Sequence, residues 1–195
     1  MTDDLASMFR QVAANMQAVA DAPYLGAVAR AIEVMHDAFA SGRKLLIFGN
    51  GGSSSDAQHL SAELVGRFVA ERRPLPAIAL TTNQAILTAW SNDYSFDDVF
   101  ARQVEALGVA GDVALGISTS GKSPNVLAAL RRARARGLVT IGLTGADSRA
   151  MGELCDVTLA VPLKETARIQ EVHLVTYHAI CAALEARLAG SAVPR

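Results

Sequence analysis

Two side chains near position 60 have the types and spacing needed to bind a metal ion or to move a proton. His59 and Glu63 are four positions apart, and a helix places both on one face, one turn apart. An imidazole and a carboxylate in that arrangement can share a metal ion or act as a proton-transfer pair. The same spacing is common in exposed polar pairs without chemistry, so spacing alone leaves both interpretations open.

The pair follows a glycine-rich segment with the sequence Gly49-Asn50-Gly51-Gly52-Ser53. Its glycines let the backbone approach a ligand without a Cβ clash. The free N–H groups at the start of the next helix favour an anion. The spacing matches neither the dinucleotide-binding fingerprint nor the Walker loop, so a tight strand-to-helix turn with a serine cap is the alternative.

A second loop carries four hydroxyl groups within six residues: Ser118, Thr119, Ser120 and Ser123. A turn glycine and a Ser-Pro helix start complete a cradle of neutral donors at a helix N-terminus. A phosphate monoester is the ligand that we expect in such a cradle. The alternative is that the hydroxyls only cap the helix, and the intervening Lys122 either adds a charge toward a phosphate or is solvated.

Two further groups of polar residues are candidates for a site. Gln170 and His178 are eight positions apart, which on a helix is about two turns, with the side chains about 80° apart around the axis. His173 lies on the Gln170 side, and an isolated histidine of this kind is more often buried and hydrogen-bonded. Asn92 and Asp93 follow a helix predicted to end near position 90; they indicate a turn first, and could also bind sugar hydroxyls.

These residues need a scaffold that brings distant loops together, and the hydrophobic pattern predicts one. Five short apolar runs are typical of buried strands: residues 44–48, 77–80, 113–117, 139–143 and 157–161. Segments of helical composition alternate with them: residues 54–68, 97–107, 124–136, 147–154 and 167–188. The alternation predicts an α/β fold with a doubly wound, five-stranded parallel sheet flanked by helices. Ligands bind such sheets outside the carboxyl ends of the strands, where both loops are expected.

The first 42 residues predict two helices ahead of the first strand. Apolar residues recur every three or four positions from Leu5 to Val19, Pro23 interrupts the pattern, and residues 27–39 resume it. We expect an N-terminal helical hairpin that caps the domain or forms an oligomer contact. Because no linker or internal repeat divides the chain, we expect a single domain over residues 1–195.

Composition argues against several classes of protein. Hydrophobic residues make up 51% of the 195 residues and charged residues 19%, which excludes a disordered chain. The net charge of −1 argues against nucleic acid as the main partner. The longest apolar runs are too short to span a membrane, so we expect no membrane contact. An acidic N-terminus and two separated cysteines, Cys155 and Cys181, predict a cytoplasmic protein with reduced thiols.

Taken together, these motifs resemble those of the phosphoheptose isomerases, whose fold belongs to the sugar-isomerase (SIS) domains. The resemblance covers essentially the whole chain and rests on residues 49–68, 92–94, 116–125 and 167–173, together with His178. Three positions depart from the family pattern. Lys122 stands where Asn is expected, Ser91 stands where Gly is usual, and Ala167 stands where some relatives have Asp.

The resemblance implies an enzyme that converts sedoheptulose 7-phosphate to D-glycero-D-manno-heptose 7-phosphate through an enediol, as the first step of bacterial ADP- or GDP-heptose synthesis. It also implies a homotetramer with active sites between subunits, packing through residues 1–42, and one Zn²⁺ per subunit. The implied acid/base residues are Glu63 and His178, and the implied zinc ligands are His59, Glu63, Gln170 and His178. The implied substrate contacts are Asn50, Gly51, Gly52, Ser53, Glu63, Arg67, Asn92, Asp93, Ser118, Thr119, Ser120, Ser123 and Gln170.

Two other functions compete with this one. An isomerase of another phosphosugar would differ only in its substrate. A non-catalytic SIS protein would sense phosphosugars or bind a protein partner. Proteins of that second kind look as if they lack residues matching Glu63 and His178, and this chain has both.

Overall fold

Five parallel strands form one sheet in the computed structural model, which describes residues 1–21 and 23–188. The strands are β1 (Leu45–Gly49), β2 (Ala77–Ala79), β3 (Val113–Ser118), β4 (Val139–Thr144) and β5 (Val157–Ala160). Their order across the sheet is β2-β1-β3-β4-β5, and every neighbouring pair is parallel. The predicted five-stranded parallel sheet is confirmed. Residues 22 and 189–195 of the predicted domain lie outside the described residues.

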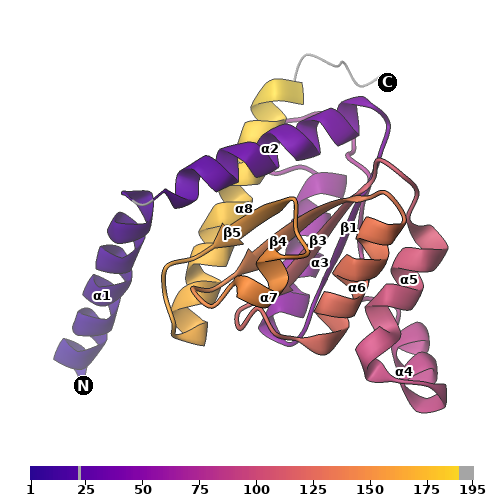
Figure 1. Ribbon diagram of the computed structural model, residues 1–195. Helices are drawn as coiled ribbons and strands as arrows, with labels where there is room; N and C mark the ends of the chain where they lie inside the picture. Colours follow the sequence, from indigo (N-terminus) through magenta and orange to yellow (C-terminus); the bar gives the residue numbers. More distant parts are fainter. Residues whose placement is uncertain (22, 189–195) are drawn as a thin grey trace.

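The strands are apolar on both sides because helices cover both faces of the sheet. In β1, Leu45 and Ile47 join one hydrophobic cluster while Leu46 and Phe48 join the other, as the alternation of a strand requires. The first face is covered by α2 (Tyr24–Ala40), α3 (Gly52–Val65) and α8 (Thr166–Leu188). The second is covered by α5 (Val99–Leu107), α6 (Pro124–Ala135) and the short α7 (Arg149–Gly152). Figure 1 shows this doubly wound arrangement.

The strand order reverses at β1. The chain passes from β1 outward to β2 and then places β3 on the other side of β1. The loops that follow β1 and β3 therefore lie next to each other at the carboxyl edge of the sheet, where open parallel sheets bind ligands. These are the glycine-rich and hydroxyl-rich loops, so the topology brings the two predicted ligand loops together.

Two helices precede the sheet, as predicted. The first, α1 (Thr2–Ala20), projects away from the body of the molecule and meets α2 at an angle (Figure 1). Of the residues described in α1, Val19 alone is buried, and Leu5, Met8 and Phe9 are more than half exposed. An apolar stripe of α1 is thus uncovered in the single chain.

The longest helix, α8, has 23 residues and packs against α2 and α3. It buries apolar side chains such as Ile180 and Leu184 but also carries charged residues, among them Arg168 and Glu171. Across residues 1–21 and 23–188, no helix combines the length and the hydrophobicity needed to cross a bilayer.

Two helix ends differ from the prediction. The helix predicted over 54–68 begins at Gly52 and ends at Val65, so Arg67 lies in the following loop. The helix predicted to end near position 90 is α4 (Gln84–Asp93), which Asn83 caps by accepting from Ile86 N. Asn92 and Asp93 lie in its last turn, so the prediction that they form a turn is wrong. The backbone leaves the helical region only at position 94, and a 3-10 turn (Phe96–Asp98) then leads into α5.

Close packing of α6 on the sheet requires glycine at position 116. A Cβ on Gly116 would lie 2.9 Å from Val126 Cγ1 and 3.2 Å from Leu130 Cδ1.

We expect Gly116→Ala to lower the free energy of unfolding by about 1–3 kcal/mol, measured by urea denaturation, because α6 must move. Gly26→Ala is the control, since no atom of residues 1–21 and 23–188 lies within 4 Å of a Cβ at that helical position. It should leave stability unchanged or raise it by up to about 1 kcal/mol; equal stability of G116A and wild type would contradict the packing.

Candidate active site

The two predicted ligand loops are joined by a pair of side-chain hydrogen bonds. Asn50 Nδ2 donates to Asn125 Oδ1 at 2.8 Å, and Asn125 Nδ2 donates back to Asn50 Oδ1 at 2.9 Å. Asn50 follows β1 and Asn125 lies in the first turn of α6, so the bonds cross the point where the strand order reverses. Gly51, beside Asn50, has a φ of +55°, a conformation that favours glycine. The two loops are therefore joined to each other at the carboxyl edge of the sheet.

The hydroxyl-rich loop gathers its side chains into a cluster. Ser118 Oγ lies 2.9 Å from Ser123 Oγ and 3.4 Å from Ser120 Oγ. Thr119 uses its carbonyl to accept from Gly145 N at 3.1 Å. Ser123 directly precedes α6, yet its side chain makes no capping hydrogen bond to the described residues. Helix capping therefore does not account for these hydroxyls, and their position at a helix N-terminus suits an anion.

Lys122, inside this loop, contacts a neighbouring carboxylate. Its Nζ lies 2.5 Å from Asp147 Oδ2, and both side chains are mostly exposed. The chain turns sharply just before Lys122, where Gly121 has a φ of +65°. A Cβ at this position would lie 2.6 Å from Asp147 O, so the turn favours glycine. In the single chain Lys122 is thus a mostly exposed side chain paired with Asp147, which agrees with the solvated alternative.

The predicted metal-binding residues of two helices meet where α3 packs on α8. Leu60 and Leu64 bury one side of α3, and the adjacent side carries His59 and Glu63, with His59 Nε2 3.0 Å from Glu63 Oε1. His178 of α8 joins them, so that one ligand atom from each of the three side chains lies within 4.8 Å of the others. The His59–Glu63 pair is therefore part of a three-residue cluster rather than an isolated surface pair.

The donor set of this cluster fits a zinc ion. Two imidazoles and a carboxylate are side chains that zinc prefers. His178 Nε2 is buried and has no hydrogen-bond partner among the described residues, so it is available to a ligand. Gln170, the fourth predicted ligand, lies against the glycine-rich loop, because a Cβ on Gly52 would overlap its side-chain amide.

Two residues that the sequence did not single out lie on the other side of His59. The Tyr177 hydroxyl is 3.0 Å from His59 Nδ1 and 3.4 Å from Asp56 Oδ1. Burial, followed by the charge of Asp56, raises the pKa of Tyr177, so the hydroxyl keeps its proton at neutral pH. Burial also raises the pKa of Asp56. No spacing rule indicates this group, because Tyr177 and His59 are 118 positions apart.

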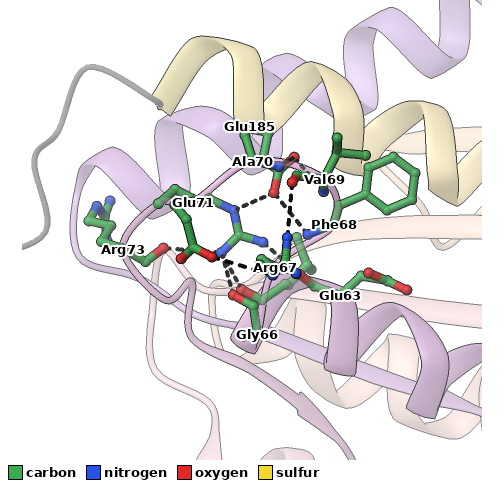
Figure 2. A network of polar contacts seen from close by, with 11 residues as sticks. Glu63, Gly66, Arg67, Phe68, Val69, Ala70, Glu71, Arg73 and Glu185 are labelled. Carbon is green, nitrogen blue, oxygen red and sulfur yellow. Dashed lines mark hydrogen bonds and ion pairs between the residues drawn. The ribbon is translucent and has the colours of Figure 1, made fainter.

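A buried carboxylate on α8 holds the loop that follows α3 (Figure 2). The Glu185 carboxylate accepts hydrogen bonds from the backbone N–H groups of Phe68, Val69 and Ala70 at 2.8, 3.0 and 3.0 Å. Its Oε1 also lies 3.5 Å from Arg72 Nε. Burial alone would raise the pKa of Glu185, but these N–H donors and the Arg72 charge outweigh it and lower the pKa.

Arg72 in turn closes the C-terminus of α3. Carbonyls in the last turn of a helix lack partners within the helix, and the Arg72 guanidinium donates to those of Glu63, Leu64 and Gly66 at 2.6, 2.9 and 3.2 Å. These bonds account for the end of α3 at Val65. Phe68 of the same loop packs against His178, with ring centroids 5.3 Å apart. The loop thus connects the end of α3 to the cluster of His59, Glu63 and His178.

Three predicted substrate contacts lie apart from the cluster in the single chain. Arg67 is mostly exposed, 3.4 Å from Glu71. Asn92 donates to Asp93 at 2.8 Å, and both are exposed on α4, which lies on the opposite side of the molecule from α8 (Figure 1). Among the described residues, none of these three side chains makes a hydrogen bond to His59, Glu63 or His178.

His173 is a residue of the core rather than of the site. It is fully buried, and its Nε2 lies 3.3 Å from Thr144 O. Burial lowers its pKa to about 4, so the ring is neutral at pH 7. This matches the buried, hydrogen-bonded interpretation of an isolated histidine.

A parallel sheet with a hydroxyl-rich loop at its carboxyl edge is the architecture of a SIS domain, and residues 8–145 match the SIS domain family. A phosphoheptose isomerase from Bradyrhizobium sp. (strain BTAi1) is 55% identical over 188 residues, which cover 95% of each chain. The structure of phosphoheptose isomerase GmhA from Neisseria gonorrhoeae is similar, with a TM-score of 0.89 and 41% identity over 95% of this chain and 98% of that one. A phosphoheptose isomerase from Francisella tularensis has the same TM-score, with 38% identity and the same coverage. The chain belongs to the phosphoheptose isomerase family.

The Glu185 interactions predict a pH-dependent loss of stability in Glu185→Gln. Because the pKa of Glu185 is lowered on folding, its ionised form stabilises the fold above the unfolded value of about 4.3. That stabilisation is lost as pH falls through the folded-state pKa. We expect E185Q to be about 1–3 kcal/mol less stable than wild type at pH 7 by urea denaturation, and the difference to shrink below about pH 4.

The matched control is Glu71→Gln, which removes an exposed carboxylate of the same loop that pairs with Arg67. Surface ion pairs contribute about 0–1 kcal/mol, so E71Q should stay close to wild type at both pH values. A stability difference for E185Q that does not change with pH would contradict the account of Glu185.

Proposed function

We propose that this chain is an aldose–ketose isomerase that converts sedoheptulose 7-phosphate to D-glycero-D-manno-heptose 7-phosphate, the first step of bacterial heptose synthesis for surface glycans. The observation that carries the proposal is the cluster of His59, Glu63 and His178, two of which lie on the helix that starts at the glycine-rich loop. The similarity of the chain to phosphoheptose isomerases over nearly its full length supports it.

The reaction moves a proton between two adjacent carbons and redistributes protons on their oxygens. Glu63 takes the proton from C1 of the ketose and returns it to C2, so that a cis-enediol forms between the two transfers. His178 serves the two oxygens through Nε2, which has no hydrogen-bond partner in the part of the chain that the structure describes. General acid–base groups of this kind contribute about 10²–10⁴-fold each.

The two joined loops hold the rest of the substrate. The phosphate is held by the hydroxyl-rich loop: Ser118, Thr119, Ser120 and Ser123. The sugar end is held by Gln170 and by the glycine-rich segment Asn50, Gly51, Gly52 and Ser53. Fixing the phosphate fixes the distance of the reacting carbons from Glu63, and this loss of freedom before reaction raises the rate.

A zinc ion fits the same cluster, with His59, Glu63, Gln170 and His178 as its ligands. Bound there, zinc would supply Lewis-acid polarisation of the substrate carbonyl. Glu63 has two carboxylate oxygens, so one can face an ion while the other accepts a proton. Metal binding and proton transfer both require His178 Nε2. Removing the metal ion with a chelator distinguishes the two roles, because only the first depends on the ion.

The proposal includes a cytoplasmic homotetramer of single-domain subunits with active sites between them. Arg67, Asn92 and Asp93 are assigned to the substrate yet lie apart from the cluster within one chain, as expected if a neighbouring subunit supplies them. The uncovered apolar stripe of α1 is suited to packing of residues 1–42 between subunits.

The test is incubation with sedoheptulose 7-phosphate in D₂O, followed by NMR, for wild type and Glu63→Gln. We expect wild type to form the heptose 7-phosphate with deuterium at C2, and E63Q to lose at least about 10²-fold of the rate because the base is absent. Chelator treatment should lower the wild-type rate, and added Zn²⁺ should restore it.

The control is the fold of E63Q, checked by circular dichroism and gel filtration. Full activity of a correctly folded E63Q would refute Glu63 as the base. A folded wild type with neither conversion nor deuterium exchange would refute the enzyme and favour a non-catalytic phosphosugar-binding protein.

A further inference from the structure

We propose that Asp56 and Tyr177 are positioning residues that keep the ring proton of His59 on Nδ1, so that His59 Nε2 presents a lone pair to a metal ion. The inference deepens the proposed function, on which it rests for taking His59, Glu63 and His178 as a metal site. It assigns roles to two residues that are neither metal ligands nor substrate contacts.

The direction of the hydrogen bonds follows from what each group can donate. A hydroxyl has one proton to give, and an ionised carboxylate can only accept. Among the described residues, Tyr177 makes the only hydrogen bond to the Asp56 side chain, at 3.4 Å, and Asp56 Oδ2 is buried without a partner. If the hydroxyl proton pointed to His59 instead, neither Asp56 oxygen would have a partner. The Tyr177 proton therefore faces Asp56, and its oxygen accepts from His59 Nδ1 at 3.0 Å.

With its proton on Nδ1, His59 has Nε2 left for the cluster. Nε2 lies 3.0 Å from Glu63 Oε1, so this nitrogen is the one that faces the cluster. A metal ion would bind to the Nε2 lone pair, and the Nδ1 hydrogen bond to Tyr177 would stay in place. A ligating histidine commonly donates its other N–H to a fixed acceptor, which holds both the tautomer and the ring orientation.

The position of Tyr177 connects the two helices that supply the ligands. Asp56 and His59 lie on α3, whereas Tyr177 lies on α8 directly before His178. The Tyr177 ring also packs edge-on against both imidazoles, with centroids 5.4 Å from His59 and 5.1 Å from His178. Tyr177→Phe keeps this ring and removes only the hydroxyl, so it isolates the hydrogen bonds from the packing.

The experiment is calorimetric titration of ZnCl₂ into metal-stripped, full-length protein. We expect Tyr177→Phe to bind zinc about 10–100-fold more weakly than wild type, as other losses of a ligand's hydrogen-bond partner do. Asp56→Asn should weaken zinc binding as well. The double variant should be little weaker than Y177F alone, because both substitutions act through His59 Nδ1.

Tyr24→Phe is the matched control. Its buried hydroxyl also bonds to α8, 2.8 Å from Thr176 Oγ1, but it makes no hydrogen bond to the cluster among the described residues. Y24F should therefore bind zinc as wild type does. Equal weakening in Y24F and Y177F would overturn the proposal, because a general loosening of α8 would explain both.

Nitrogen-15 NMR of labelled histidine gives a readout that does not depend on activity. The chain has four histidines, so comparison with His59→Asn identifies the His59 signals. We expect the zinc-loaded wild type to carry the His59 proton on Nδ1. Wild-type affinity in Y177F, a proton on Nε2 in the zinc-loaded protein, or no zinc binding by wild type would each overturn the proposal. Wild type that binds zinc as expected but does not isomerise the heptulose phosphate would refute the proposed function and leave the roles of Asp56 and Tyr177 standing.

Discussion

The packing of α3 on α8 is the constraint on which the site depends, because neither helix carries a complete set of metal-binding groups. His59 and Glu63 come from α3, and His178 comes from α8. Apolar side chains on adjacent sides of the same helices set their separation, including the fully buried Leu60 and Leu184. Each such side chain contributes roughly 1.5–3 kcal/mol by burial. Non-directional hydrophobic packing thus determines where the polar groups meet.

Hydrogen bonds and ion pairs then fix the loops and helix ends that hydrophobic packing alone does not position. Burying a lone carboxylate costs several kcal/mol, so Glu185 is stable inside the fold only with its three backbone donors and Arg72. Arg72 also donates to the last carbonyls of α3, and the loop held in this way places Phe68 against His178. The paired amides of Asn50 and Asn125 act in the same way between the two ligand loops. In both places a few directional bonds join segments that are distant in sequence.

Features of the fold and the site could be predicted where they depend on residues close together in the sequence. Apolar runs such as Leu45–Phe48 predict strands because a sheet covered on both faces needs apolar residues at every position, and the architecture followed. The His59–Glu63 spacing predicted a pair on one helix face, which is also a local property. The helix end at Val65 was predicted too late, because Arg72, seven positions further on, determines it.

Contacts between segments that are distant in the sequence could not be predicted, because they leave no pattern of residue types or spacing. Tyr177 looks like an ordinary core residue in the sequence, and only the meeting of α3 and α8 places its hydroxyl between Asp56 and His59. Asn92 and Asp93 indicated a turn by composition, yet the cap at Asn83 starts a helix that includes them. Hydrogen bonds over more than a hundred positions become visible only once the packing is known.

The central claim is that α3 and α8 together form a metal site, and anomalous diffraction at the zinc edge from zinc-loaded crystals tests it most directly. The account predicts an anomalous peak at bonding distance, about 2.0–2.2 Å, from His59 Nε2, a Glu63 oxygen and His178 Nε2. A peak elsewhere on the chain, or a cluster without zinc at saturating concentration, would contradict it.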